Sequence, residues 1–245
     1  MKIKNLILSL VVIVTLSSCV FVEEIHVDDN GKGNYSFKMD MGEMMSSLSE
    51  MSPKDSLSQP EVTDTIVYFK DILLEKKDSI SKLSKEEQEA FESLGKFKMH
   101  MQIDEAEGKM IMDISTDFNS LSDLRNVQKN IAKAQVLQDK KGDKGEMPSN
   151  ADITYTLKNK TFRRSVALKK FTEDEQANYD QAMEKASMFL EGSLYKVIYH
   201  FESDVKKVSF EGAQISDDKK TVTIEVLMDS LTKNPQMLDF EIKLK

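Results

Sequence analysis

The chain has 245 residues, of which 40% are hydrophobic and 31% are charged, a composition typical of a globular protein and not of a disordered one. Its formal net charge of −8 argues against nucleic acid as a partner, because nucleic-acid binding requires clustered Lys and Arg. Its single cysteine, Cys19, excludes an intrachain disulfide, CxxC redox chemistry and a zinc site built from thiolates.

The first 18 residues have the pattern of a secretory leader. Lys2 and Lys4 give a positive start, and residues 6–16 form an apolar run. A membrane-spanning helix needs roughly 18 or more apolar residues, so this run is too short to be one. We therefore interpret residues 1–18 as a signal peptide that is cleaved.

The leader ends in Leu16, Ser17 and Ser18, which are followed by Cys19. These four residues resemble the lipobox of bacterial lipoproteins. The resemblance implies cleavage before Cys19 and several acyl chains, palmitate among them, on that cysteine. It thus implies a lipid-anchored protein of the bacterial cell envelope, because more than one acyl chain gives stable attachment to a membrane.

The residues after Cys19 indicate how the protein would be held to a membrane and which membrane that would be. The mature chain would have 32 basic and 42 acidic residues, so the lipid and not a basic surface would hold it to the membrane. The pair Glu23 and Glu24 resembles the acidic surface-export signals of some bacterial lipoproteins. We therefore expect the outer membrane or the cell surface in preference to the inner membrane.

Alternating apolar residues predict two β-hairpins in the first half of the chain. The first joins residues 20–27 to 34–41 through Asn30-Gly31, a pair that adopts positive φ at low cost. The second joins residues 97–103 to 110–114. Helices are predicted over residues 42–51, 66–83, 85–95 and 121–137. Capping boxes are predicted at Ser84 to Glu87 and at Ser120 to Asp123, where the last two of these helices begin.

The second half begins after residues 138–151, a stretch rich in Gly and charge that predicts a loop or linker. A third hairpin is expected over residues 153–157 and 162–168, followed by a helix capped by Thr172 and ended by Gly192. Further strands are predicted at residues 195–201, 208–210, 222–226 and 238–244.

These elements predict an α+β fold with about ten strands in antiparallel hairpins and four to five helices packed on one face of the sheet. The expected organisation after the leader is a subdomain over residues 19–137, the linker 138–151 and a second subdomain over residues 152–245. The alternative is that the two α+β parts form one domain.

The last fifty residues carry a second resemblance. Residues 195–201 (YKVIYHF), 205–208 (VKKV) and 212–222 (GAQISDDKKTV) resemble the end of the LppM-type lipoprotein domain, in which a strand, a short turn and a polar turn before Lys-Thr-Val recur. The resemblance implies the fold and an envelope location. It transfers no catalytic residue.

No motif in the sequence predicts catalysis or a cofactor. HExxH, GxSxG, GxxxxGK[ST] and GxGxxG are all absent. The three histidines, His26, His100 and His200, fall in separate predicted strands, so we expect isolated surface residues and no metal site. A carboxylate pair for glycoside hydrolysis stays open as an alternative, because the chain has 42 acidic residues.

Methionine is unusually frequent, with fourteen residues after the leader. The residues that stand out are Met39, Met41, Met44, Met45, Met99, Met101, Met110 and Met112. Their alternation predicts the inward face of a sheet, where flexible Met fills gaps. The alternatives are an adaptable apolar pocket and a thioether site for Cu(I).

The sequence thus predicts a lipid-anchored envelope protein that is not an enzyme and that binds or assembles with another envelope component. The expected partners are the membrane, through Cys19, and either an envelope protein or an apolar or glycan ligand. The alternatives are an envelope hydrolase with paired carboxylates and a carrier of an apolar ligand.

Overall fold

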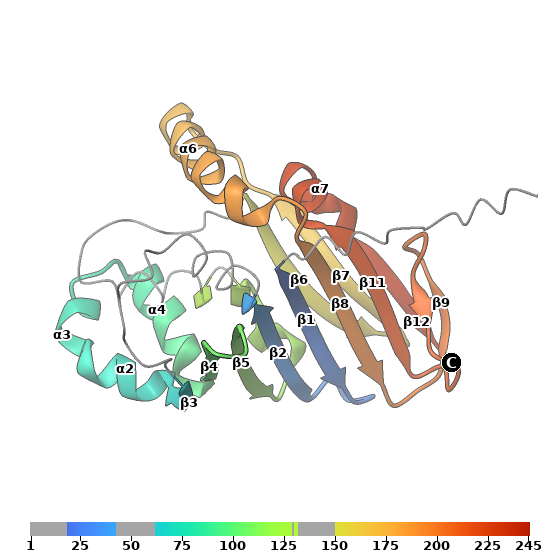
Figure 1. Cartoon of the computed structure of the whole chain (residues 1–245). Helices are drawn as coiled ribbons and strands as arrows, with labels where there is room; N and C mark the ends of the chain where they lie inside the picture. Colours follow the sequence, from blue (N-terminus) through green and yellow to red (C-terminus); the bar gives the residue numbers. More distant parts are fainter. Residues whose placement is uncertain (1–18, 43–61, 129, 132–149) are drawn as a thin grey trace, which may run out of the picture.

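The structure, a computed structural model, describes residues 19–42, 62–128, 130–131 and 150–245 (Figure 1). These ranges contain twelve strands and five α-helices, which confirms the predicted α+β class with more strands than expected. Residues 43–51 of the predicted helix over 42–51, the greater part of the linker, and Met44 and Met45 lie outside the described residues.

The larger sheet has eight strands, and its centre is made by the first strand of the chain. Its strands in spatial order are β10 (Gln214–Ile215), β11 (Thr221–Leu227), β8 (Leu194–Phe201), β1 (Val20–Val27), β2 (Gly33–Asp40), β5 (Lys109–Phe118), β4 (Lys98–Asp104) and β3 (Val62–Tyr68). Every neighbouring pair is antiparallel except β1 and β8, which run parallel. The expectation of a purely antiparallel sheet is therefore wrong at this one junction.

The β1–β8 pair joins strands from both sides of the predicted linker. β1 through β5 precede that linker in the chain, and β8, β10 and β11 follow it. A parallel pair cannot be closed by a hairpin, and here the connection from β1 to β8 spans residues 28–193. Hairpin signals in the sequence give no indication of such a pairing.

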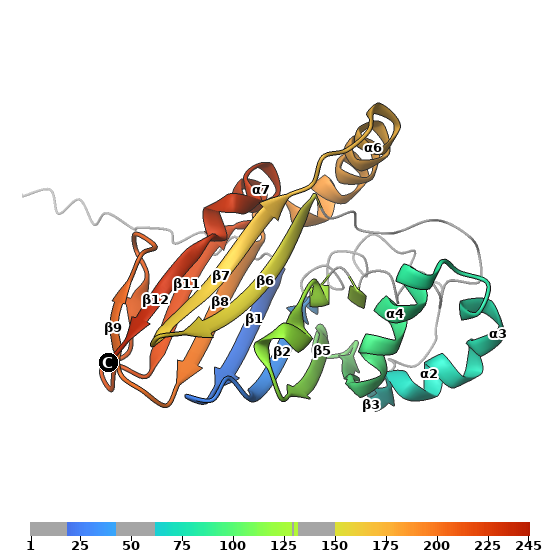
Figure 2. The same cartoon turned by 180° about the vertical axis from the view of Figure 1, so that it is seen from behind.

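The smaller sheet has four strands. In spatial order these are β6 (Ala151–Lys158), β7 (Thr161–Leu168), β12 (Phe240–Leu244) and β9 (Val205–Val208). It lies against β1, β8 and β11 (Figures 1 and 2), and the ring centroid of Phe162 is 5.1 Å from that of Tyr199 and 5.4 Å from that of Phe201. The prediction that helices cover this face is thus wrong here, because a second sheet buries it.

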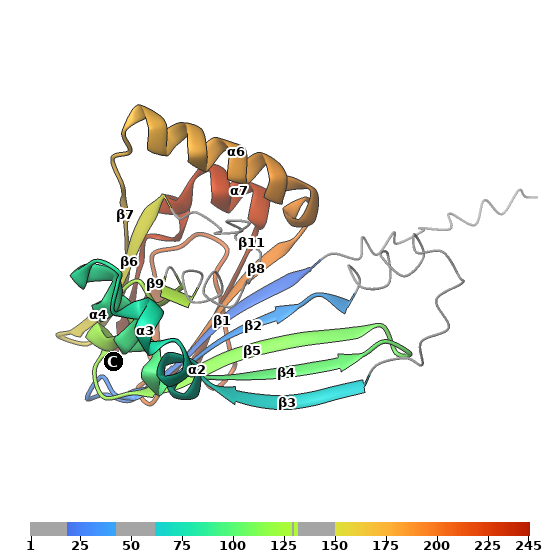
Figure 3. The same ribbon diagram turned by 90° about the vertical axis from the view of Figure 1, so that its left-hand side faces the viewer.

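The helices occupy two places at the margins of the sheets. Figure 3 shows α2 (Phe69–Glu75), α3 (Lys77–Ile80) and α4 (Lys85–Ser93) together near one end of β3 and β4. On another side, α6 (Glu173–Leu190) and α7 (Met228–Lys233) lie together. The 3-10 turns are η1 (Leu94–Lys96), η2 (Leu121–Leu124) and η3 (Pro235–Leu238).

Two of the predicted capping boxes are confirmed. Ser84 and Glu87 satisfy each other's backbone N–H groups at the start of α4. Thr172 and Glu175 do the same at the start of α6. The third, at Ser120, is wrong as a capping box, because the Ser120 side chain accepts from Ser122 N and opens a 3-10 turn instead of an α-helix.

Two other predicted helices differ from the structure. The stretch expected to be helical from residue 66 is strand β3 as far as Tyr68, because its β-branched and aromatic residues pair with β4. In the described part of the helix expected over residues 121–137, Asn126 has a positive φ of 52° and interrupts the helix; residues 132–137 lie outside the described residues. Its apolar stripe is nevertheless buried as predicted, at Leu121, Leu124, Val127 and Ile131.

Candidate functional site: an apolar cavity over a buried ion pair

A cavity of about 220 Å³ lies between the two sheets and beneath α6 and α7. β1 and β2 contribute Phe21, Phe37 and Met39. α6 contributes Tyr179, Met183 and Leu190, and α7 contributes Met228, Leu231 and Thr232. The remaining walls come from β6, β7, β8, residues 126–128, Ile131, Asn150 and Pro235, so the cavity is assembled from elements along nearly the whole chain.

The methionine alternation is partly explained by this cavity. Met39 lines it, as the alternative of a Met-containing apolar pocket predicted. Met99 is buried in the core, which agrees with the prediction of an inward face. On β5, Met112 pairs with Met39 of β2 on one side and with Met101 of β4 on the other. The three methionines therefore form one row across three neighbouring strands.

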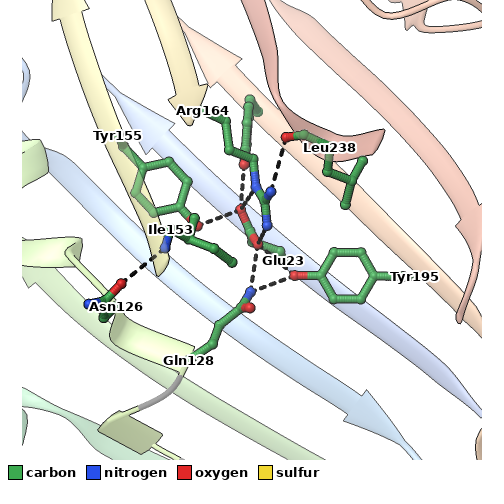
Figure 4. A network of polar contacts seen from close by, with 9 residues as sticks. Glu23, Asn126, Gln128, Ile153, Tyr155, Arg164, Tyr195 and Leu238 are labelled. Carbon is green, nitrogen blue, oxygen red and sulfur yellow. Dashed lines mark hydrogen bonds and ion pairs between the residues drawn. The ribbon is translucent and has the colours of Figure 1, made fainter. Parts of the chain in front are cut away.

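Behind the cavity lies Glu23, a carboxylate with no exposed surface. It belongs to the inward-facing set of β1, with Phe21 and Ile25 on either side. Its Oε1 accepts hydrogen bonds from Tyr155 Oη at 2.9 Å and from Tyr199 Oη. Its Oε2 accepts from Tyr195 Oη at 2.6 Å and from Gln128 Nε2 at 2.6 Å (Figure 4).

Arg164 supplies the opposite charge. Its guanidinium donates from Nη2 to Glu23 Oε2 at 3.3 Å and from Nη1 to the carbonyl of Leu238 at 3.0 Å. The side chain is 2% exposed and projects inward from β7, between Phe162 and Val166. The ion pair therefore connects the central strand of the larger sheet to the smaller sheet across the core.

The charge of Arg164 and the hydrogen bonds to Glu23 together determine the protonation of this cluster. Burial alone raises the pKa of a carboxyl group, but Arg164 and the hydroxyls of Tyr195 and Tyr199 outweigh it and hold the pKa of Glu23 below its ordinary value. Burial lowers the pKa of Arg164, but the Glu23 carboxylate together with Tyr155, Tyr199 and Tyr195 outweighs it, so the net pKa is well above its ordinary value. The site thus contains one fixed negative and one fixed positive charge.

The tyrosines of the cluster stay protonated. Burial, with the Glu23 charge beside them, raises the pKa of Tyr155, Tyr195 and Tyr199 well above the ordinary value. Their hydroxyls are committed to Glu23 as donors. Gln128 donates from Nε2 to Glu23 and to Tyr195 and also lines the cavity, so its side-chain amide belongs to the polar end of the cavity.

The predicted lipid attachment site lies at the start of the described chain. Leu16, Ser17 and Ser18 are outside the described residues. Cys19 immediately precedes β1, is 9% exposed, and its carbonyl accepts from Leu194 N at 3.1 Å. The first strand therefore follows the predicted anchor with no intervening linker.

The histidines are placed differently from the expectation. His26 and His200 stack with ring centroids 3.9 Å apart, so the expectation that they are isolated is wrong. His100 lies on β4, where Nε2 is 2.6 Å from Asp64 Oδ1, and β2 and β5 separate it from β1.

Paired carboxylates do not line this cavity, since none of its described lining residues is Asp or Glu. A second depression, of about 650 Å³, lies between α6 and α7 and is lined by Asp180, Glu184, Glu191 and Asp229 among others. The first three are solvent-exposed, whereas a general acid is typically held in an apolar pocket that raises its pKa.

Reasoning from the sequence missed Glu23 and Arg164, although a signal was present. In β1 the inward positions are Phe21, Glu23, Ile25 and Val27, and in β7 they are Phe162, Arg164 and Val166. A charged residue at an inward position of a strand must be paired if it is buried. An acidic residue at an inward position of one strand and a basic residue at an inward position of another therefore predict a buried ion pair. The interpretation of Glu23 as part of an export signal does not explain its burial.

No protein family model matches the chain, and no curated protein shows significant sequence similarity to it. Among solved structures, it is similar to the NMR structure of the folded domain of LppM from Mycobacterium tuberculosis. The similarity has a TM-score of 0.40 at 6% sequence identity and covers 93% of this chain and 89% of that one. At this level no site residue can be transferred between the two proteins.

Among the described helices, none is both long enough and apolar enough to cross a bilayer.

Proposed function

We propose that the protein is a lipid-anchored, non-enzymatic binding protein of the bacterial cell envelope, and that its cavity holds the alkyl part of an uncharged amphiphile. The observation that supports this is an apolar cavity ending on a polar cluster whose charges are already paired. Binding pockets of this kind combine apolar walls with a few polar groups that orient the ligand.

The size of the cavity sets the size of the ligand. An apolar protein cavity of about 150 Å³ accommodates benzene, and this cavity of about 220 Å³ is somewhat larger. It therefore has room for a short alkyl segment or one ring. Met39, Met183 and Met228 line it, and flexible methionines let its walls adapt to different apolar shapes.

The charge of the polar end determines the head group. The Arg164 guanidinium would attract a carboxylate, but Glu23 already neutralises it at 3.3 Å. An ionised head group would then be buried without a counter-charge, which is costly. A hydroxyl group can instead hydrogen-bond with the Gln128 side-chain amide, so the site favours an alcohol over an acid or an amine.

Calorimetric titration with octanol, octanoate and octylamine tests this proposal. The three ligands share a chain and differ in head-group charge. The chain from residue 19 onward, made without the leader and hence without lipid, avoids detergent that would compete for the cavity. We expect octanol to bind and the two charged ligands to bind at least about tenfold more weakly, a difference of 1.4 kcal/mol or more.

Two variants of α6 show where binding occurs. Met183→Trp fills the cavity and should weaken octanol binding at least about tenfold. Lys185→Trp adds the same side chain at an exposed position of the same helix that does not line the cavity and should leave binding unchanged. Equal affinity of both variants and the unmodified chain, or no octanol binding up to its solubility limit, would refute the proposal.

A further inference from the structure

The outer face of the β1–β8 pair carries a cluster of three side chains with metal-ligating atoms. In the parallel register His26 lies opposite His200, and Glu24 lies two residues earlier on β1. Residues two apart on a strand share a face, so all three project away from the side that buries Glu23. Two consecutive acidic residues of β1 thus lie on opposite faces of the sheet, Glu23 on the inward face and Glu24 on the outward face.

The ligand atoms of the three side chains lie close together. Glu24 Oε1 lies 3.1 Å from His26 Nε2 and 2.8 Å from His200 Nε2. One ligand atom from each residue lies within 4.8 Å of the others. Ligands about 2.0–2.1 Å from a tetrahedral zinc ion are about 3.3 Å apart. The rings of His26 and His200 are stacked with an angle of 6° between their planes, so one ring must turn out of the stack for both Nε2 atoms to ligate the same ion.

The second nitrogen of His200 has a partner that suits metal binding. His200 Nδ1 lies 3.1 Å from Thr221 Oγ1 on β11. When Nδ1–H donates to the Thr221 hydroxyl, the Nε2 lone pair is directed at the Glu24 oxygen. Two facing lone pairs repel each other, whereas a cation between them is ligated by both. Metal-ligating histidines are typically fixed in this way through their other ring nitrogen.

The three side chains are partly exposed to solvent, so an ion bound by them would keep open coordination positions. The side chains of Glu24, His26 and His200 are 35%, 55% and 30% exposed. Nearby on this face, Lys196 is already paired with Glu225 at 2.6 Å. Water or an external ligand could thus complete the coordination of an ion held by three protein groups.

We propose that Glu24, His26 and His200 form a binding site for a divalent transition-metal ion, with zinc as the ion that fits its donor set. Two imidazole nitrogens and one carboxylate oxygen are the ligands of zinc sites that keep an open position. Calcium and magnesium prefer oxygen-only sites, so the two nitrogens favour zinc, nickel or copper(II) over them. This inference is independent of the function proposed for the cavity.

Zinc titration of the full-length protein, solubilised in a non-ionic detergent and monitored by competition with a fluorescent zinc chelator, tests the site. We expect one zinc ion per chain with a Kd of about 10 μM or tighter. His26→Gln and His200→Gln should each weaken zinc binding about 100-fold. His100→Gln, which changes the remaining histidine of the chain, should leave it unchanged.

The Thr221→Val variant distinguishes a metal site from a surface cluster whose side chains only form hydrogen bonds with one another. Removing the hydroxyl that orients His200 should weaken zinc binding about tenfold without touching a ligand. Substitution of zinc by cobalt(II) gives a second readout, since its visible absorption reports the number and type of ligands. Circular dichroism of each variant without metal checks that the fold is retained, and Glu24→Gln replaces any histidine variant that does not fold.

Three outcomes would overturn the proposal. The first is no zinc binding at about 100 μM free ion, where a site with a Kd of 10 μM would be about 90% occupied. The second is equal zinc affinity of the unmodified protein and the folded His200→Gln variant. The third is loss of binding in His100→Gln, which would place the ion elsewhere.

Discussion

At the scale of single residues, the most unusual feature is that two fully buried side chains of opposite charge face each other across the core. Glu23 and Arg164 are 0% and 2% exposed, and they lie 141 residues apart in the sequence. Neither charge could be buried alone. The three tyrosines and Gln128 supply hydrogen bonds that offset the loss of water around the carboxylate.

Glu23→Gln should lower the free energy of unfolding by about 3–5 kcal/mol, because it leaves the Arg164 guanidinium buried without a counter-charge. Urea denaturation of the chain from residue 19 measures this loss. Replacing both partners by apolar residues, as Glu23→Leu with Arg164→Met, leaves no unpaired charge but removes the acceptor of three buried tyrosine hydroxyls, so it should recover only part of the loss.

Glu241→Gln is the matched control for that experiment. Glu241 pairs with Arg163 at 2.6 Å, but both side chains are more than a third exposed. Such a pair contributes about 0–1 kcal/mol, so the variant should unfold nearly as the unmodified chain does. A similar small loss for Glu23→Gln would contradict the role assigned to the buried pair.

At the scale of elements, the patterns that act over a few residues predicted the structure well. The first hairpin pairs β1 with β2 around Gly31 at φ 79°, and the third turns at Asn159 and Lys160, both with positive φ. The prediction failed at β3, where apolar residues at helical spacing lie in a strand. A short stretch of β-branched residues pairs wherever a neighbouring strand is available, and that neighbour is not visible in the local sequence.

Gly33→Ala should destabilise the protein by about 2–3 kcal/mol. A Cβ at this position would lie 1.7 Å from the carbonyl oxygen of His26, so the start of β2 must move away from β1. Thermal unfolding followed by circular dichroism measures the effect.

Gly95→Ala is the comparison at a glycine with space around it. Its Cβ would lie 3.6 Å from Leu73 Cδ1, an ordinary contact, and the change should stay within about 1 kcal/mol. Equal stability of the two variants would show that the close approach at Gly33 is not required for the hairpin.

At the scale of the whole molecule, β1 connects the proposed anchor to both candidate sites. It begins one residue after Cys19, its inward face carries Phe21 and Glu23, and its outward face carries Glu24 and His26. We propose that the acyl chains on Cys19 hold the central strand, and with it the sheet, close to the bilayer.

Cys19→Ala should release the protein from the membrane or leave it with an uncleaved leader, because the acceptor of the lipid is lost. Membrane fractionation and mass spectrometry of the N-terminus distinguish these two results. Ser18→Ala keeps a small residue before the cysteine and should remain lipidated. A cleaved Cys19→Ala product that still requires detergent for extraction would contradict the lipid anchor.

Features that depend on residues close together in the chain could be predicted from local patterns: the α+β class, the hairpins, the capping boxes of α4 and α6, and the apolar stripe of Leu121, Leu124, Val127 and Ile131. The parallel pairing of β1 with β8, which places Glu23 near Tyr195 and His26 against His200, depends on packing between distant parts of the chain. Such a pairing closes a loop of more than 160 residues, and no local turn or periodicity encodes its partner or register. Both candidate sites depend on that junction, so composition and motifs alone indicated neither of them.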